Sequence, residues 1–256
     1  MMRRVSRGDR SPKWVTLPPA EVWHTRPVVP NPLSQDIADA ARELQGAEGS
    51  QDTMDAVVRL AQDLVDNCQE AGISLVYGRE RIDTPAATGD VPRRVDELQY
   101  EFDQGPCLDA IREQESVYCP DLEDEQRWGE WAAATTRETG VRSMLCFRLF
   151  TNEETVGALN LYAYRPDAFG DNDRDQGLAL AAHAAVAVAA AQEIDQLKTA
   201  KDGRTIIGQA QGILMERFDL DATRAFQVLI RVSSTHNRKL RVVAEELTQT
   251  RRTPGI

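Results

Sequence analysis

The chain has few of the side chains that bind metals or form disulfides. Among its 256 residues there are 4 cysteines and 3 histidines. The cysteines, at positions 68, 107, 119 and 146, include no Cys-x-x-Cys pair, and no spacing of cysteine and histidine matches a zinc site. The sequence therefore predicts no metal and no cofactor. The cysteine pattern also fits a reducing compartment better than a disulfide framework.

Long hydrophobic runs are missing as well. The longest, residues 178–191, is mostly alanine and contains His183, so it is too short and too weakly hydrophobic to span a bilayer. Proline, tryptophan and threonine follow the basic N-terminus instead of an apolar segment, which does not support a signal peptide. We expect a cytoplasmic protein with no membrane partner. Its 41% hydrophobic residues suffice for one large or two modest domains.

Negative charge is abundant but unevenly distributed. The formal net charge is −11, yet residues 1–34 and residues 199–256 each carry +4, and residues 35–198 carry −19. This asymmetry suggests a nucleic-acid-facing end attached to a body that repels nucleic acid. An acidic block that keeps a small-molecule domain soluble explains the same numbers, and the two explanations are compatible.

The first 34 residues are rich in arginine and proline. Six prolines, at positions 12, 18, 19, 27, 30 and 32, prevent a long helix, so residues 1–34 are predicted to be a flexible basic arm. Trp14 and Trp23 are unusual in such a segment and could anchor it on a folded surface or a partner; plain disorder is the alternative. Residues 35–50 are predicted to form a short helix, capped by Ser34, and a linker.

Residues 51–197 alternate between helical and strand patterns. Apolar residues at helical spacing predict a helix over 53–67, followed by a strand at 73–77, and no strand is assigned to the next stretch, which contains Pro85 and Gly89. The later predicted elements are a short helix at 91–100, a helix after Gly105-Pro106, a strand at 116–119, a helix at 128–139, a hairpin of strands at 143–150 and 155–164, and a long helix from about 171 to at least 197.

This order of elements resembles the GAF domain. The resemblance is carried by Gly105-Pro106-Cys107, by Asp121 with Trp128, by the Gly-Val-Arg-Ser stretch at 140–143, and by residues 156–162 followed by Phe169 and Asp173. It implies an α+β sensor domain at 51–197, an antiparallel sheet flanked by helices, that binds an unknown small molecule. The Asn-Lys-Phe-Asp-Glu signature of the cyclic-nucleotide-binding branch is absent, which argues against cyclic AMP or GMP.

Three short amphipathic segments follow within residues 198–250. Their apolar stripes predict three helices that share one small core, and Asp221 and Asn237 are predicted to cap the second and the third. The stripes consist of Ile206, Ala210, Ile213 and Leu214, then Ala222, Ala225, Phe226, Leu229 and Ile230, then Leu240, Val243, Ala244 and Leu247. The long helix is expected to continue directly into the first of these three helices.

The same segments resemble the ANTAR domain of bacterial antitermination regulators. The matching residues are the Ile-Gly-Gln-Ala-Gln-Gly-Ile-Leu-Met stretch at 207–215, Ala225-Phe226, Leu229, Ser233 and residues 237–244. The resemblance implies an all-α three-helix bundle that binds RNA hairpins in nascent transcripts and prevents a terminator from forming. Residues 251–256 are predicted to be a disordered tail.

Seven residues are candidates for RNA binding: Arg204, Arg224, Arg231, His236, Arg238, Lys239 and Arg241. At 100° per residue, Arg224 and Arg231 lie nearly opposite the apolar stripe of the second helix. Positive charge at the first turn of the third helix opposes the helix macrodipole and is better explained by phosphate contact. His236 could stack on a base. For any single arginine a solvated face is the favoured explanation, and His236 could equally be a turn residue.

Two further groups of residues are candidate sites. Cys107 is expected near a helix N-terminus, where the dipole would lower the thiol pKa for redox or ligand sensing; a buried packing role is the alternative. The long helix is apolar nearly all round, so an identical helix is expected to cover its second side; a core helix covered by the rest of the same chain is the alternative. The residues expected in this homodimer contact are Leu178, Ala185, Val188, Ile194 and Leu197.

Together the two resemblances imply a signal-responsive RNA-binding antitermination regulator, and we expect that it is not an enzyme. Two alternatives remain open. The three helices could be a DNA-binding helix-turn-helix, although the turn at 233–236 lacks the usual glycine. Some GAF-like proteins also use cysteines to reduce methionine sulfoxide, for which Cys107 and Cys119 are the candidates.

Overall fold

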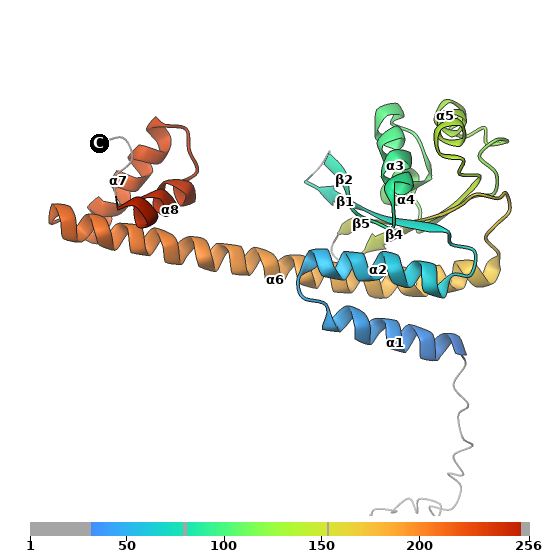
Figure 1. Ribbon diagram of the computed structural model, residues 1–256, viewed down its shortest axis with the longest axis horizontal. Coiled ribbons are helices and arrows are strands. Elements are labelled where there is room, and N and C mark those ends of the chain that lie inside the picture. The colour runs from blue at the N-terminus through green and yellow to red at the C-terminus, as the bar shows by residue number, and fades with distance from the viewer. Residues whose placement is uncertain (1–31, 79–80, 153, 252–256) are drawn as a thin grey trace, which may run out of the picture.

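The computed structural model describes residues 32–78, 81–152 and 154–251 (Figure 1). The predicted arm up to residue 31 and the tail from residue 252 lie outside the described residues. The helices are α1 (Pro32–Gly46), α2 (Ser50–Leu64), α3 (Asp90–Phe102), α4 (Pro106–Arg112), α5 (Gly129–Thr139), α6 (Asp171–Phe218), α7 (Ala222–Thr235) and α8 (Leu240–Thr250). The strands are β1 (Glu70–Tyr77), β2 (Arg81–Ala87), β3 (Ser116–Cys119), β4 (Ser143–Phe150) and β5 (Thr155–Ala163).

The strands form one antiparallel sheet in the order β2-β1-β5-β4-β3. Helix α2 and the first part of α6 cover one face, with α1 outside them, and α3, α4 and α5 lie on the other face (Figure 1). Strands β1, β5 and β4 in the middle of the sheet therefore have a helical layer on both faces. This is the α+β sensor arrangement that the sequence predicted.

Each face of the sheet has its own hydrophobic core because side chains alternate along a strand. In β4, Phe147 belongs to the core under α2 and α6, whereas Cys146 belongs to the core under α3, α4 and α5. Helix α6 approaches the sheet closely at Gly177, where an added Cβ would lie 2.4 Å from the Phe147 ring. The start of α6 is thus fixed on the sheet.

Helix α6 is a single helix of 48 residues, roughly 70 Å long at 1.5 Å per residue. It begins on the sheet and ends inside the C-terminal bundle (Figure 1), so the predicted continuation of the long helix is confirmed. Within the described residues, α6 is long enough and apolar enough to cross a membrane. Of the 18-residue window that meets these criteria, 33% is buried. A core helix of a soluble protein meets the same criteria, so this is weak support for a span.

The C-terminal part of α6 forms a small bundle with α7 and α8. Its buried residues are Ala210, Leu214, Ala225, Leu229, Val243, Ala244 and Leu247. Asp221 caps α7 as predicted, and its carboxylate accepts the Arg224 backbone N–H at 2.8 Å. The cap predicted at Asn237 is wrong. Asn237 has φ 47° and belongs to the turn, and α8 starts after Lys239 with no side-chain cap.

Strand β2 is the main element that the sequence did not predict. It contains Pro85, which is usually incompatible with a central strand because proline donates no backbone hydrogen bond. Strand β2 lies at the edge of the sheet and pairs only with β1 among the described strands. An edge strand tolerates proline on its open side.

Candidate nucleic-acid interface and sensor site

The bundle exposes most of the basic side chains predicted to bind RNA. They come from α6 (Arg204), from α7 (Arg224 and Arg231), from the α7–α8 connection (His236, Arg238 and Lys239) and from α8 (Arg241). Arg238 is partly buried, and the other six are exposed. All three helices of the bundle therefore contribute positive charge to its surface.

Three of these arginines form ion pairs inside the bundle. Arg224 lies 3.4 Å from Asp221, Arg238 lies 2.6 Å from Glu246, and Arg241 lies 2.8 Å from Glu245. The partners are partly solvent-exposed, so the pairs stabilise the bundle little. For Arg204, Arg231 and Lys239, no ion pair exists with any residue that the structure describes. These three cations are the ones most available to a polyanion.

The bundle also exposes large apolar side chains. Phe226 and Ile230 of α7 were predicted to lie in the bundle core, but 37% of Phe226 and 43% of Ile230 is exposed. The core position of α7 is taken instead by Ala225 and Leu229, because a three-helix bundle of this size buries only a narrow stripe of each helix. The other exposed large apolar residues of the bundle are Met215, Phe218 and Val242.

The interior of the sensor domain contains a buried carboxylate. Asp96 of α3 is fully buried, and Ser74 and Thr84 each donate a hydroxyl to its Oδ2 at 2.7 Å. Tyr162 donates to Oδ1 at 2.9 Å and Gln99 at 3.0 Å. Burial raises the pKa of the Asp96 carboxyl above its ordinary value, and these hydrogen bonds offset part of the rise. All of these partners are neutral, so the carboxylate has no countercharge among them.

Two more side chains extend this network. Asn160 of β5 donates to Ser74 Oγ at 2.9 Å, but its own Oδ1 is buried without a hydrogen-bond partner. The network thus joins α3 to the central strand β5 and its neighbour β1, on the face opposite α2 and α6. An unpaired buried acceptor usually costs about 1–3 kcal/mol, so this site is not fully satisfied. Sequence reasoning did not find Asp96, because a single acidic residue within a helix gives no signal of burial.

The structure corrects the prediction of a reactive thiolate at Cys107. This residue is fully buried, its thiol donates to Ser74 Oγ at 3.3 Å, and its backbone N–H donates to Gln99 at 2.9 Å. Burial raises the pKa of the Cys107 thiol, and the nearby Asp96 raises it further. The dipole of α4, a helix of 7 residues, is too small to overcome this desolvation. Cys68, Cys119 and Cys146 are buried as well.

The exposed face of α6 differs from the predicted dimer face. Ala185 and Val188 are fully buried in the core under α2 and the sheet, so they are unavailable for contact with a second copy. The exposed apolar residues are Val186 at 63%, Ile194 at 50% and Leu197 at 62%, with Leu178 at 37%. The error arises because the helix is apolar nearly all round, and periodicity alone cannot say which side faces the sheet.

Asp195 is the last residue of α6 before the exposed stretch 196–202. Its carboxylate accepts the backbone N–H of Ser50 at 2.8 Å, and this bond lowers the pKa of Asp195. Ser50 begins α2, whose N-cap residue Gly49 has φ 91° and offers no side chain to cap the helix. The carboxylate of α6 therefore caps α2 and ties the two helices together.

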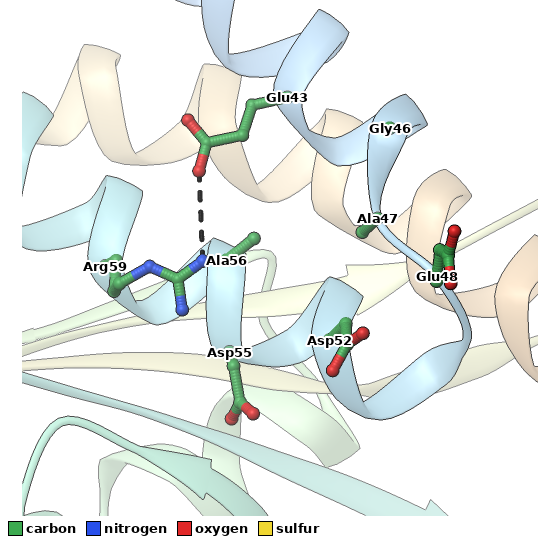
Figure 2. Close-up of a pocket in the computed structure, with 8 residues that line it drawn as sticks. All are labelled: Glu43, Gly46, Ala47, Glu48, Asp52, Asp55, Ala56 and Arg59. Atoms are coloured by element: carbon green, nitrogen blue, oxygen red, sulfur yellow. Dashed lines mark ion pairs between the residues drawn. The ribbon is translucent and has the colours of Figure 1, made fainter.

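A shallow acidic hollow of about 420 Å³ lies between α1 and α2. Its carboxylates are Glu43, Glu48, Asp52 and Asp55, and its one cation is Arg59, which lies 3.9 Å from Glu43 (Figure 2). The apolar part of its lining is Ala47 and Ala56. Most of its negative charge is open to solvent, so the hollow adds to the acidity of the sensor domain.

The fold and its surfaces define a sensor-type α+β domain joined by one helix to a basic helical bundle. A family model of the GAF domain matches residues 47–189, and a model of the ANTAR domain matches residues 195–247. The chain therefore belongs to the GAF family and carries an ANTAR domain after its GAF domain. This combination defines a signal-regulated regulator of the ANTAR type.

Solved structures share this fold at low sequence identity. The GAF domain of an Acinetobacter phosphoenolpyruvate-protein phosphotransferase is 17% identical, with a TM-score of 0.53 over 65% of this chain and 99% of that one. The photosensory core module of the Stigmatella aurantiaca phytochrome is 12% identical, with a TM-score of 0.53 over 82% and 45%. The free methionine-R-sulfoxide reductase of Neisseria meningitidis is 13% identical, with a TM-score of 0.50 over 63% and 91%. No curated protein matches the chain.

Proposed function

We propose that this protein is a cytoplasmic, signal-responsive RNA-binding regulator of transcription antitermination. In this proposal the ANTAR bundle binds hairpins in nascent transcripts, and the GAF domain controls it. The observation that carries the proposal is α6, which packs in the core of the GAF domain and also supplies Ala210 and Leu214 to the core of the bundle. A change in the sensor that shifts α6 must shift the first helix of the bundle.

The RNA contacts are assigned to the basic surface of the bundle. Arg204, Arg231 and Lys239 contact phosphates, because they are exposed cations without an ion pair in the described part of the chain. Lys239 also precedes the uncapped N-terminus of α8, whose free N–H groups and dipole favour a phosphate. Arg224, Arg238 and Arg241 exchange their carboxylate partners for phosphates, and His236 stacks on an unpaired base.

A homodimer formed through α6 gives the two bundles a shared RNA surface. Val186, Ala190, Glu193 and Leu197 lie on the exposed side of α6 at alternating spacings of four and three residues, which is the repeat of a two-stranded coiled coil. Ile194 borders this seam. Because Glu193 interrupts the apolar positions, pairing is weak enough to respond to a signal.

The input to the GAF domain is a small molecule that rearranges the Asp96 network. Such a ligand acts on β1 and β5 through Ser74 and Asn160, and the other face of these strands contacts α2 and α6. A redox input is disfavoured because all four thiols are buried. The same burial, with raised pKa values for Cys107 and Cys119, argues against a thiol-based reductase, so we infer that the protein is not an enzyme.

The test is direct binding of nucleic acids by the full chain, measured by fluorescence anisotropy. The probes are an RNA with two short hairpins, an unstructured RNA of equal length, and duplex DNA. We expect preference for the hairpins and a log-log salt slope of about −0.7 for each phosphate contact. Lys239→Glu and Arg231→Glu weaken binding, whereas Arg137→Glu, an exposed arginine of α5, does not. Preference for duplex DNA would identify a helix-turn-helix instead.

A further inference from the structure

A long groove of about 1330 Å³ lies where α6 leaves the GAF domain. One wall is formed by the end of β1 and by the β4–β5 hairpin around its turn, and the other by residues of α6 between 186 and 200. Ser50 and Asp195, which join α2 to α6, also line it. The groove therefore follows the last part of α6 that contacts the sensor.

The lining of this groove combines negative charge with exposed rings. Its charged residues are Glu154, Glu193 and Asp195, and none of its lining residues is lysine or arginine. Glu154 and Glu193 form no ion pair with any other residue in the described ranges. Tyr77 and Phe150 line the walls with 44% and 41% of their surface exposed, and Val186 contributes more apolar surface. Such a groove fits an occupant that is both basic and aromatic.

We propose that this groove is occupied by part of the N-terminal arm of the same chain, residues 3–23. This segment contains five cations, Arg3, Arg4, Arg7, Arg10 and Lys13, against two carboxylates, and it contains Trp14 and Trp23. Its prolines disfavour a helix, which suits a narrow groove. The charge and the aromatic content of the arm are thus the complement of the lining.

The length of the arm is sufficient. The described chain begins at Pro32, at the start of α1, and α1 ends at Gly46, four residues before Ser50 in the groove. The 15 residues of α1 span about 22 Å. The nine residues that separate Trp23 from Pro32 extend up to about 30 Å. Trp23 therefore reaches back to the groove, and the residues before it, including Trp14, extend further along it.

The acidic hollow between α1 and α2 is a poorer place for the arm. It offers carboxylates to the arginines, but the apolar part of its lining is limited to Ala47 and Ala56, and it already contains Arg59 (Figure 2). The two tryptophans would gain little buried surface there. The groove offers Tyr77, Phe150 and Val186 in addition to its charge.

Occupation of the groove has a consequence for pairing of α6. Val186 and Ala190 line the groove and also lie on the α6 face assigned to the homodimer. An arm in the groove therefore opposes the approach of a second α6 and holds the regulator in its unpaired state. This consequence rests on the proposed dimer, whereas docking of the arm does not depend on the proposed function.

The experiment uses the full chain with p-benzoylphenylalanine in place of Trp23. After irradiation, mass spectrometry maps the adducts, and mixing of isotopically labelled and unlabelled chains distinguishes contacts within a chain from contacts between chains. We expect adducts within one chain at residues 150–156 and 186–200, reduced several-fold by Glu154→Lys. As a matched control, Asp55→Lys in the acidic hollow leaves the yield unchanged. Adducts at α1, at α2 beyond Ser50 or at the bundle, or only between chains, would overturn the proposal.

RNA binding is the other role that suits a basic arm with tryptophans. A variant that lacks both tryptophans distinguishes RNA binding by the arm from docking of the arm in the groove. If the arm docks in the groove, Trp14→Ala combined with Trp23→Ala leaves hairpin affinity unchanged or raises it. If the arm binds RNA and does not dock in the groove, this variant weakens hairpin binding and the groove adducts are absent without RNA; that result would overturn the proposal. Failure of the chain to bind any RNA would contradict the proposed function but would leave the crosslinking result interpretable.

Discussion

The GAF domain and the ANTAR bundle differ in how much side-chain surface they bury in their cores. The GAF domain has two cores, completely buried large side chains such as Trp131 and Phe147, and an internal hydrogen-bond network around Asp96. The hydrophobic core of the bundle consists of seven buried residues, three of them alanine, and Phe218, Phe226 and Ile230 are exposed. The contrast indicates that the GAF domain has the larger buried cores, whereas the bundle has a narrow core and exposes large apolar side chains.

Large-to-small substitutions should show this contrast most strongly. Phe147→Ala is expected to lower the free energy of unfolding of the GAF domain by about 4 kcal/mol. Leu229→Ala costs about 3 kcal/mol, which is enough to unfold the small bundle while the GAF domain stays folded. Far-UV circular dichroism follows both parts. In a chain with Trp14→Phe and Trp23→Phe, tryptophan fluorescence comes from Trp128 and Trp131, both in the GAF domain, and follows that domain alone. Simultaneous loss of both signals in Leu229→Ala would show that the two parts fold as one unit.

Asp96 tests how far the stability of the GAF domain depends on its buried network. Asp96→Ala leaves hydroxyl and amide donors unpaired and is expected to cost about 2–3 kcal/mol. Asp96→Asn keeps the size of the side chain and is expected to cost less.

The pH dependence of stability gives a second prediction for Asp96. Burial raises the pKa of Asp96 in the folded chain, so the folded chain binds more protons than the unfolded chain between the two pKa values. Stability contributed by this group is therefore complete below the unfolded pKa and is lost as the pH rises through the folded pKa. Asp96→Asn does not titrate and should gain stability relative to wild type as the pH rises. The free energy of unfolding of both proteins is measured in urea at several pH values. An equal change with pH in wild type and in Asp96→Asn would contradict a raised pKa of Asp96.

Glu193 tests whether the exposed side of α6 is an interface. Glu193→Leu completes the apolar seam and is expected to tighten dimerisation about tenfold, measured by sedimentation velocity. Asp202→Leu is the matched control, because it removes the same charge from an exposed position of α6 outside the seam. Equal effects of the two variants would show that net charge, and not the seam, controls association.

The smallest effect is expected at Asp195. Asp195→Ala removes the acceptor for Ser50 N–H and should speed hydrogen exchange at the start of α2 and in α6 around residues 192–200. Asp195→Asn retains an acceptor and should exchange like wild type. Unchanged exchange in Asp195→Ala would show that this contact does not tie α6 to the GAF domain.

The elements that the sequence predicted best are those whose pattern is local. Strands β3 and β4 were predicted to the residue, since alternating side chains and nearby turns define them, and the unbroken α6 followed from its uninterrupted helical spacing. Strand β2 was missed because Pro85 is compatible with a strand only at a sheet edge, and strand order is not visible in the sequence. The Asn237 cap failed because Asn also favours a left-handed turn.

The sites depended on tertiary contacts and were predicted less well. Cys107 follows a helix-start signal, but the burial that raises its pKa comes from α3 and the sheet. Ala185 and Val188 are of the same residue types as exposed positions of α6. Only packing on the sheet distinguishes the buried side of the helix from its exposed side. The basic residues of the bundle were predictable as exposed, whereas their ion pairs with Glu245 and Glu246 were not.

A proline in the exposed stretch of α6 tests whether this helix couples the GAF domain to the ANTAR bundle. Lys198→Pro interrupts the helix between the two domains, and Lys198→Ala removes the same charge without interrupting it. We predict that Lys198→Pro weakens binding of the two-hairpin RNA at least about tenfold, while Lys198→Ala stays close to wild type. Wild-type affinity in Lys198→Pro would show that the bundle acts independently and would contradict the account.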